Sequence, residues 1–418
     1  MKNYSNQIKQ LSRAMLYLIC GLILVTSPTL AGKSTTIDGI VHMSNGDQPS
    51  DGRETMKLSE LWRAGGEEDE DSIFGVITQV RVDKDLNTYL LDTQLSEVKV
   101  YDPSGEMIRT LSREGDGPGE VRTPIDMVFL QDGSLGILQA FPGRVVKVDL
   151  AGDPAGDITI GSPEEGGLVV LIDAQSREGQ MVLGGTRIAQ GTPGSRTTTN
   201  FIASFNEAGE ELVRYEEGVT TMDFTNLKIS EDDQYFPHLR HWAISRDGRI
   251  YTAPQRNEYV INVYSQDGEL ERIIKRQFDV PPRTEEQNAN IQAIFEAQTA
   301  NSPIEIDFKA SDNEPVITSI FLDAKDFLWV EHSMSNRDQP DGVMRTYDVF
   351  DVSGHLVKQV AIECEGDGSS DGLIFAGESR VLLVKGYIGA LRSLSAGGAP
   401  IGTSDEEEAP MEVVCFSR

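Results

Sequence analysis

The stretch "YDPSGEMIRTL" (Tyr101–Leu111) decides how the chain is interpreted. It consists of an aromatic residue, three turn-forming residues, a glycine and then a segment with the alternation of a β-strand. Glycine adopts the positive φ that tight hairpin turns need, so the pattern predicts two strands joined by a turn. Further copies of the pattern begin at Val148, Phe205, Tyr264 and Phe350.

A second pattern precedes these copies. It consists of an apolar strand, a short polar turn and another strand, as in "WAISRDGRIYTAP" from Trp242. Its copies begin at Val80, Met127, Leu171, Trp242, Ile320 and Leu373. Two consecutive hairpins make four strands, which is the content of one propeller blade. The sequence therefore predicts an all-β fold: a six-bladed β-propeller of four-stranded antiparallel blades over residues 54–418.

The last of the six units lacks its fourth strand. It has a first hairpin and then "MEVVCF" (Met411–Phe416) close to the end of the chain. Near the start, "MKLSELWRAGGEEDED" (Met56–Asp71) has the pattern of a fourth strand followed by a glycine-rich acidic loop. We therefore expect residues 54–63 to form the outer strand of the last blade, which removes both free edges of the ring.

Glycine-rich acidic strings recur where one blade is expected to lead into the next. "GDGPG" (Gly115–Gly119) is one of them, and related strings follow Trp62, Ile160 and Cys364. A phosphate-binding loop would need a lysine and a following helix. "GDGPG" has neither, so it predicts a structural turn.

These motifs together resemble those of a known group of proteins. "GDGPGE" after a strand, "GRIY" (Gly248–Tyr251) or "FLWV" (Phe327–Val330) in a second strand, and the "YDPSG" turn are similar to bacterial exported six-bladed β-propellers related to NHL repeats. Val121 replaces the aromatic residue that is usual in that family, whereas Pro124 is kept. The resemblance covers about residues 54–418 and implies a fold and a location more than a reaction.

The first 31 residues have the pattern of a signal peptide. Lys2, Lys9 and Arg13 precede the apolar run Ala14–Val25, and Ala31 ends a segment of small residues. This order is typical of a cleaved export signal, and a single membrane anchor is the alternative. Residues 32–53 are rich in turn-forming residues and are predicted to be a linker. We therefore expect an exported protein, periplasmic or secreted.

The composition limits the partners. The formal net charge is −30, and a surface of that sign repels nucleic acid and anionic lipid. Beyond the signal, no stretch is long and apolar enough to span a membrane. We expect a monomer that binds no nucleic acid.

Two cysteines remain after residue 31, Cys364 and Cys415. In an oxidising compartment such a pair predicts a disulfide. Two unpaired buried thiols are the alternative.

One helix is expected between blades four and five. Thr284 and Gln287 have the spacing of a capping box, and an apolar stripe follows, which predicts a helix over residues 284–300. Residues 186–200, 332–344 and 385–410 are expected to form long loops on the same side of the disc. We expect any ligand there, over blades four and five.

Candidate site residues come from these loops. His238, His241, His332 and Glu331 carry groups that bind zinc or copper, and we expect them to face the same side. Ordinary packing of these residues is the alternative. Tyr235, Phe236, Arg240 and Trp242 are predicted to line a ligand groove on this face, with blade packing as the alternative.

Calcium is the second metal considered. Carboxylates at the blade junctions are hard oxygen ligands of the kind that calcium prefers. Solvated acidic turns are the alternative. The residues concerned are Glu114, Asp116, Glu120, Asp367 and Asp371.

Two functions follow from this pattern. The first is a binding module that presents a loop-rich face to a protein, a peptide or a glycan. The alternative is a metal-dependent hydrolase or lyase with its site at the central channel, using a divalent metal such as zinc or calcium. The sequence contains no nucleophile elbow, no CxxC pair and no zinc-protease helix, and this favours the binding module.

Overall fold

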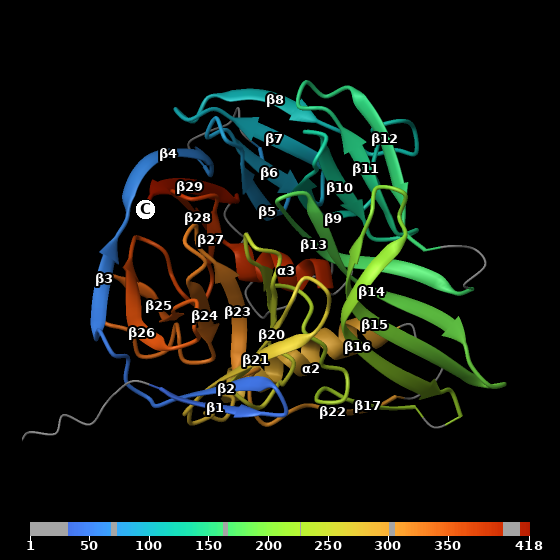
Figure 1. Ribbon diagram of the computed structural model, residues 1–418. Coiled ribbons are helices and arrows are strands. Elements are labelled where there is room, and N and C mark those ends of the chain that lie inside the picture. Colours follow the sequence, from blue (N-terminus) through green and yellow to red (C-terminus); the bar gives the residue numbers. More distant parts are fainter. Residues whose placement is uncertain (1–31, 68–72, 162–165, 226, 301–305, 396–409) are drawn as a thin grey trace, which may run out of the picture.

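Six antiparallel sheets stand in a ring around a common centre (Figure 1). The computed structural model describes residues 32–67, 73–161, 166–225, 227–300, 306–395 and 410–418. Each sheet has a core of four antiparallel strands, which follow one another in sequence from the centre outward except that β4 is the outer strand of the sixth sheet. The predicted fold, a six-bladed β-propeller, is therefore confirmed, and so is the resemblance to six-bladed propellers at the level of fold.

Blades one to three are continuous in sequence. Blade three is the largest of them, because its last three strands have 11, 11 and 13 residues. The strands are β5 (Ile77–Val82), β6 (Thr88–Asp92), β7 (Glu97–Tyr101) and β8 (Met107–Leu111); β9 (Pro124–Phe129), β10 (Leu135–Gln139), β11 (Arg144–Val148) and β12 (Pro154–Thr159); and β13 (Leu168–Arg177), β14 (Gln180–Gln190), β15 (Ser195–Phe205) and β16 (Glu211–Asp223).

Blades four to six follow, and the sixth takes its outer strand from the N-terminal part of the chain. Their strands are β18 (Trp242–Ile244), β19 (Ile250–Thr252), β20 (Val260–Tyr264) and β21 (Leu270–Arg276); β23 (Ile317–Leu322), β24 (Leu328–His332), β25 (Val343–Phe350) and β26 (Leu356–Glu363); and β27 (Gly372–Ala376), β28 (Arg380–Val384), β29 (Glu412–Ser417) and β4 (Ser59–Gly65). A small parallel pair, β17 (Lys228–Ser230) and β22 (Asp307–Lys309), lies outside the blades.

The N-terminal strands run along the outside of three blades (Figure 1). β4 pairs antiparallel with β29, which confirms that an N-terminal strand completes the last blade. The strand covers Ser59–Gly65, whereas the prediction was 54–63. β3 (Arg53–Lys57) pairs instead in parallel with β26 and adds a fifth strand to blade five.

Residues 32–53, which were predicted to be a linker, contain regular β structure. β1 (Lys33–Ile37) and β2 (Ile40–Asn45) form a hairpin, and β2 pairs in parallel with β21 of blade four. β1 is exposed at every position, so its sequence carries no burial pattern that could mark it as a strand. The linker prediction is corrected here: the segment is an extension of blade four.

Asn45 fixes this extension to the neighbouring blade. Its amide group donates to the carbonyl oxygens of Lys275 (3.1 Å) and Gly354 (2.9 Å), and its Oδ1 accepts the backbone N–H of Leu356 (2.9 Å). The side chain is buried, so these bonds satisfy polar groups that water does not reach. Asn45 therefore joins blades four and five.

The repeated glycine turn has the geometry expected from the sequence. In the first copy the carboxylate of Asp102 accepts the N–H groups of Ser104 and Glu106, and Gly105 has a φ of +88°. A Cβ at Gly105 would lie 2.5 Å from the side chain of Trp62. The glycine is needed both for its backbone conformation and for the close approach of blade six.

The "GDGPG" segment is a structural turn, as predicted. The Glu120 carboxylate accepts the N–H of Gly117 at 2.8 Å and forms an ion pair with Arg113 at 2.7 Å. The Ser112 hydroxyl donates to the carbonyl oxygen of Gly119. Glu120 therefore orders the turn from within, and Arg113 balances its charge.

Two helices accompany the blades. α2 (Glu285–Thr299) follows blade four, and Thr284 and Gln287 form the predicted capping box. α3 (Tyr387–Ser395), which was not predicted, lies between β28 and β29 and crosses the middle of the ring (Figure 1). Among the described residues, neither helix has the length and apolar character that a membrane crossing requires.

Buried ion pairs hold the start of α2. Glu231 pairs with Arg283 at 2.6 Å and with Arg256 at 2.8 Å, and Arg283 also pairs with Glu314 at 2.8 Å. Both arginine side chains are almost fully buried. Because each charge has a partner, the network joins the segment before α2 to blade four without leaving an isolated buried ion.

Cys364 and Cys415 are free thiols, so the predicted disulfide is not formed. Side chains alternate between the two faces of a strand. Val414 and Phe416 of β29 pack in the cluster that Cys364 also contacts, between blades five and six. Cys415 points to the opposite face of β29, toward blade one.

Candidate functional site

A cavity of about 420 Å³ occupies the central channel of the ring. Its lining comes mainly from the first strand of each blade, which is the innermost one. Four of these strands contribute a polar residue at an equivalent place: Gln79, Asp126, Asp173 and Ser319.

A break in strand pairing directs these four side chains. The pairing of each inner strand with its neighbour skips one residue just before the polar position, and the skipped residues are Thr78, Ile125, Ile172 and Thr318. Such bulges re-aim side chains and are common beside functional sites. The channel is therefore polar at one level because the same irregularity occurs in four blades.

Asp126 is the buried charge on the side of blade two. Its Oδ1 accepts from Arg81 at 2.8 Å, and its Oδ2 accepts the N–H of Ala174 at 3.0 Å. Burial raises the pKa of Asp126, and the Arg81 guanidinium acts in the opposite direction. Arg81 and Asp126 form an ion pair across blades one and two.

Asp173 lies next to it on blade three. Its Oδ2 accepts from the indole N–H of Trp242 at 2.7 Å and from the backbone N–H of Leu239 at 2.6 Å. Burial raises the pKa of Asp173 to about 7, and the nearby Asp126 acts in the same direction. Oδ1 is buried and accepts no hydrogen bond from a described residue. Asp173 is therefore a carboxyl group that changes its charge near neutral pH.

The space around Oδ1 is narrow. Nδ1 of His238 lies 3.9 Å from this oxygen. The opposite position on β14 is Gly184, and a Cβ there would collide with Oδ1. Burial lowers the pKa of His238 to about 3, so the imidazole beside Asp173 is neutral above that pH.

Arg240 reaches the channel from the turn before β18. Its guanidinium donates to the Tyr387 hydroxyl at 2.6 Å and lies 5.1 Å from the centre of the Tyr387 ring. The same hydroxyl donates to the carbonyl oxygen of Thr78 at 3.1 Å. Tyr387 is the first residue of α3, so these contacts join α3 to blades one and four at the channel.

Aromatic side chains form the wall on blades five and six. Phe321 stacks on Phe375 with ring centroids 4.5 Å apart, and Tyr347 meets Phe375 edge-on at 5.4 Å. All three line the cavity. The channel therefore has an ionic wall on blades one to three and an aromatic wall on the far side of the ring.

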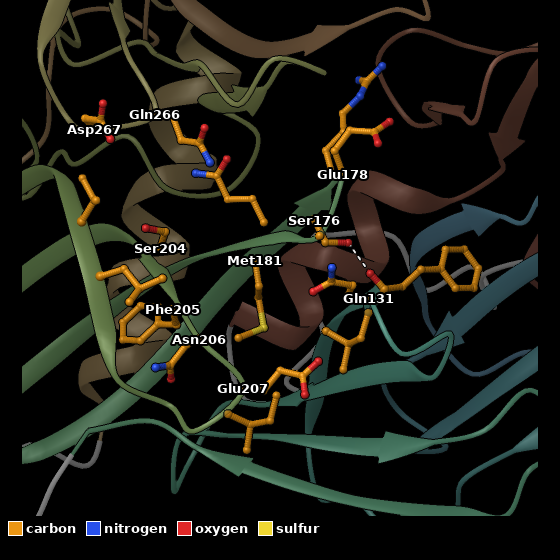
Figure 2. Close-up of a pocket in the computed structure, with 18 residues that line it drawn as sticks. Gln131, Ser176, Glu178, Met181, Ser204, Phe205, Asn206, Glu207, Gln266 and Asp267 are labelled. Atoms are coloured by element: carbon orange, nitrogen blue, oxygen red, sulfur yellow. Dashed lines mark hydrogen bonds between the residues drawn. The ribbon is translucent and has the colours of Figure 1, made fainter.

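A second cavity, of about 810 Å³, adjoins the first over blades two to four (Figure 2). Turn residues line it, among them Gln131, Glu178, Asn206 and Gln266. Phe129, Ser176 and Arg177 line both cavities. We call the second cavity the turn-side groove, and the shared residues connect it with the channel.

The turn-side groove lies on the side of the disc opposite to the predicted ligand face. Its lining turns join first to second or third to fourth strands, whereas α2 and α3 follow a fourth and a second strand. Of the loops predicted on the helix side, residues 186–200 mostly continue β14 and β15 as a hairpin. Residues 396–409 lie outside the described residues.

The four predicted metal ligands lie against different groups, and the His238 imidazole, 3.9 Å from Asp173, makes no hydrogen bond to a described residue. His241 Nδ1 lies 2.7 Å from the carbonyl oxygen of His238, His332 Nε2 lies 3.6 Å from Asp348, and Glu331 is paired with Arg345. Among the described residues, no three His, Cys, Asp or Glu side chains are grouped so that they could hold a metal ion. The described structure thus does not bring the proposed zinc ligands together.

The acidic blade junctions, considered for calcium, are used within their own loops. Asp116 pairs with Arg122 at 2.8 Å. Asp371 accepts the N–H groups of Asp367 and Gly386. These contacts are those of ordered turns.

Of the residues predicted to line a ligand groove, Arg240 lines the channel, and the other three line neither the channel nor the turn-side groove. Tyr235 donates its hydroxyl proton to the carbonyl oxygen of Ala253, and Phe236 packs against the His238 ring. Trp242 is fully buried and bonds Asp173. Three of the four residues therefore pack within or between blades.

The sequence contains a pattern that indicates the two aspartates of the channel. "PIDMVF" (Pro124–Phe129) and "LIDAQ" (Leu171–Gln175) place an aspartate inside an apolar inner strand. A buried carboxyl group is costly unless it has a partner or a function. The repeat alignment would have put both aspartates at the centre of the ring.

No protein-family model matches the chain, and no curated protein matches its sequence. Among solved structures, a suspected exported protein of Bacteroides fragilis NCTC 9343 has 8% identity and a TM-score of 0.47, with 90% of this chain and 99% of that chain covered.

Two further solved structures have similar values. Virginiamycin B lyase from Staphylococcus aureus has 9% identity and a TM-score of 0.41, covering 85% of this chain and 98% of that chain. Regucalcin, a calcium-binding protein from Agrobacterium tumefaciens str. C58, has 12% identity and a TM-score of 0.43. The match covers 87% of this chain and 96% of that chain. At this level of similarity nothing about function passes from those proteins to this one. By its own strand pairing, the chain is a six-bladed β-propeller closed by its N-terminal strands.

Proposed function

We propose that this protein is an exported binding protein whose ligand enters the central channel. The ligand is a small amphipathic molecule or the terminal unit of a peptide or glycan. A longer ligand would continue along the turn-side groove, which shares three lining residues with the channel. We therefore expect the ligand in the channel, and no longer on the helix-bearing face.

The difference between the two channel walls carries the proposal. Arg81, Asp126 and Asp173 offer charges on one side, and Phe321 and Phe375 offer apolar rings on the other. Ligand sites in proteins are typically apolar concavities with a few fixed polar groups. The polar groups here are held by hydrogen bonds, so they do not need to be ordered on binding.

A binding role is favoured over the metal-dependent hydrolase or lyase. That alternative needs three protein ligands in one place, and the described residues do not supply them. A channel with fixed polar and aromatic groups needs no further component to bind a ligand.

The test compares a blocked channel with a blocked groove. Ser319→Trp places an indole in the channel, and Asp267→Trp places one on an exposed turn of the groove. Small peptides, oligosaccharides and amphipathic acids and amines are screened by ligand-observed NMR. We expect Ser319→Trp to abolish binding of the ligands found and Asp267→Trp to weaken only the longer ones. Ligands that bind equally to the wild type and to Ser319→Trp would place the site elsewhere.

Export is tested separately. We propose that the mature chain begins at Gly32 and is periplasmic or secreted, and that it is a monomer. N-terminal sequencing of the protein from fractionated cells, together with light scattering, measures both. A mature chain that keeps residues 1–31 in the membrane fraction would instead support the anchor.

A further inference from the structure

We propose that Arg240 binds a carboxylate of the channel's ligand, so that the ligand is a carboxylic acid with an apolar or aromatic body. This inference rests on the proposed function, because it requires the channel to be the binding site. It adds the chemical class of the ligand and the residue that selects it.

Three carboxylates that line the cavity are already paired with other arginines. Asp126 is paired with Arg81, and Glu331 is paired with Arg345. Asp323, at the other end of the cavity, is paired with Arg418. Among the described residues, no carboxylate lies within ion-pair distance of Arg240, although its guanidinium lines the cavity. A positive charge therefore remains available in the channel.

Arg240 also retains hydrogen-bond donors. One terminal nitrogen donates to the Tyr387 hydroxyl, and this is its one side-chain hydrogen bond to a described residue. Its other side-chain nitrogens form no hydrogen bond to a described residue and are accessible to solvent. A guanidinium with free donors matches a carboxylate by two parallel hydrogen bonds.

The backbone of Arg240 is held in an unusual conformation. Leu239 and Arg240 have φ values of +48° and +73°, which side-chain-bearing residues rarely adopt. Asp173 accepts the N–H of Leu239, and the carbonyl oxygen of Arg240 accepts the N–H of Ile320 at 2.7 Å. Strain of this kind persists where surrounding contacts enforce it and is concentrated at functional sites.

Three blades therefore fix one arginine. Asp173 belongs to blade three, Ile320 to blade five, and Tyr387 to the helix inserted in blade six. This positioning lowers the entropic cost of binding, because the guanidinium is already placed. A structural role alone would not require its remaining donors to face a cavity.

The aromatic wall supplies the second half of the ligand site. Phe321, Phe375 and Tyr347 line the same cavity. Arg240 lines the same cavity as these rings, which places its charge in the space that the aromatic wall bounds. A ligand whose carboxylate meets Arg240 can therefore lay an apolar body on these rings.

Asp173 gives the interaction a pH dependence. Its pKa is raised to about 7 by burial, so its negative charge is present above neutral pH and is lost below it. His238 faces Asp173 and is neutral in this range because burial lowers its pKa to about 3, and Asp126 keeps its Arg81 partner. A carboxylate ligand is repelled less when Asp173 is protonated, so binding is stronger at pH 6 than at pH 8.

The experiment compares an acid with its neutral amide. N-acetylphenylalanine and N-acetylphenylalaninamide are titrated into the wild type and into Arg240→Gln, Arg240→Lys and Arg246→Gln by ligand-observed NMR. Arg246 is the matched control, since it lines neither cavity and pairs with Asp326 at 3.1 Å. A charge-assisted pair predicts that the wild type prefers the acid by about tenfold or more.

Each variant has a distinct expected result. Arg240→Gln binds the acid and the amide within about twofold of each other, Arg240→Lys keeps part of the preference, and Arg246→Gln keeps all of it. Glucuronate, a carboxylate without an aromatic body, binds the wild type more weakly than N-acetylphenylalanine. Thermal melting of each variant confirms that it is folded.

The experiment distinguishes a failure of the carboxylate inference from a failure of the proposed function. If acid and amide bind the wild type equally and Ser319→Trp removes both, the channel site stands and the carboxylate inference is overturned. If Ser319→Trp removes neither, the proposed function itself is wrong. An acid preference that survives in Arg240→Gln, or the absence of binding by both probes, overturns the assignment of the ligand class.

Discussion

The indole of Trp62 stacks on the phenol ring of Tyr101, with ring centroids 5.3 Å apart and planes inclined by 14°. Trp62 lies on β4, the outer strand of blade six, and Tyr101 lies on β7 of blade one. The contact joins the last blade to the first. The ring is therefore closed by packing between these blades as well as by strand pairing.

Replacing the Trp62 side chain should weaken the packing between the last and the first blade and so destabilise the propeller. Trp62 is 6% exposed, and truncation of a buried aromatic residue costs about 3–5 kcal/mol. We expect Trp62→Ala to lower the free energy of unfolding by this amount in urea denaturation. Leu61→Ala is the matched control, since Leu61 is 42% exposed on the same strand, and its effect should be small. Equal losses for both variants would contradict a closing role for Trp62.

The N-terminal hairpin should contribute to stability through Asn45. Asn45→Ala leaves the buried N–H of Leu356 without its acceptor, and an unsatisfied buried group costs about 1–3 kcal/mol. The free energy of unfolding measures the loss. Ser44→Ala, at an exposed neighbouring position, should leave stability unchanged. If Asn45→Ala is as stable as the wild type, the hairpin does not fasten blade four to blade five.

The two thiols should remain reduced and differ in reactivity. Burial raises the pKa of Cys415 to about 11, so its reactive thiolate is scarce at neutral pH. We expect a disulfide-exchange reagent to react far more slowly with Cys415 than with the half-buried Cys364 in the native protein. In denaturant, without reductant, both thiols of the chain lacking residues 1–31 should titrate. A titre of zero would restore the disulfide prediction.

The stability should depend on pH through Asp173. Its pKa is raised in the folded state, so between about pH 4 and pH 7 the folded protein holds a proton that the unfolded chain has lost. Stability from this group is therefore full below pH 4 and falls as the pH rises toward 7, by up to about 1.4 kcal/mol per pH unit. Above pH 7 the carboxyl group of Asp173 is ionised in both the folded and the unfolded state, so its contribution to stability no longer changes with pH.

Asp173→Asn isolates this contribution. The amide oxygen can still accept from Trp242 and Leu239, but it does not titrate. His238, whose pKa is lowered, acts with the opposite sign and is present in both proteins. We expect the variant to gain stability relative to the wild type as the pH rises from 4.5 to 7, as measured by urea denaturation. Parallel profiles would show that Asp173 ionises normally.

The fold was predictable because its turns are chemically specific. Gly105 and Asp102 mark a hairpin whose geometry admits few other residues, and the same pattern recurs along the chain. The closure by β4 followed from a missing strand. The hairpin of β1 and β2 was missed because it adds to an outer edge, where exposed side chains leave no periodic pattern.

The site was less predictable because it depends on which residues face the centre. His332 and Glu331 looked like metal ligands, but the fold gives them Asp348 and Arg345 as neighbours. Arg240 was predicted to lie on the helix-bearing face, and it lines the channel because Leu239 and Arg240 adopt positive φ values. No glycine marks this turn in the sequence. The helix α3 was not predicted because the composition of its segment is typical of a loop.

The path of the N-terminal strands sets the order in which the chain can fold. β2, β3 and β4 pair with β21, β26 and β29, which lie more than 200 residues further along. These contacts have a very high sequence separation, which slows folding. As the chain emerges from its N-terminal end, blades one to three can assemble locally, but β4 has no partner until β29 has emerged. Closing the ring is therefore necessarily a late event, and the unpaired N-terminal strands remain accessible to chaperones until then.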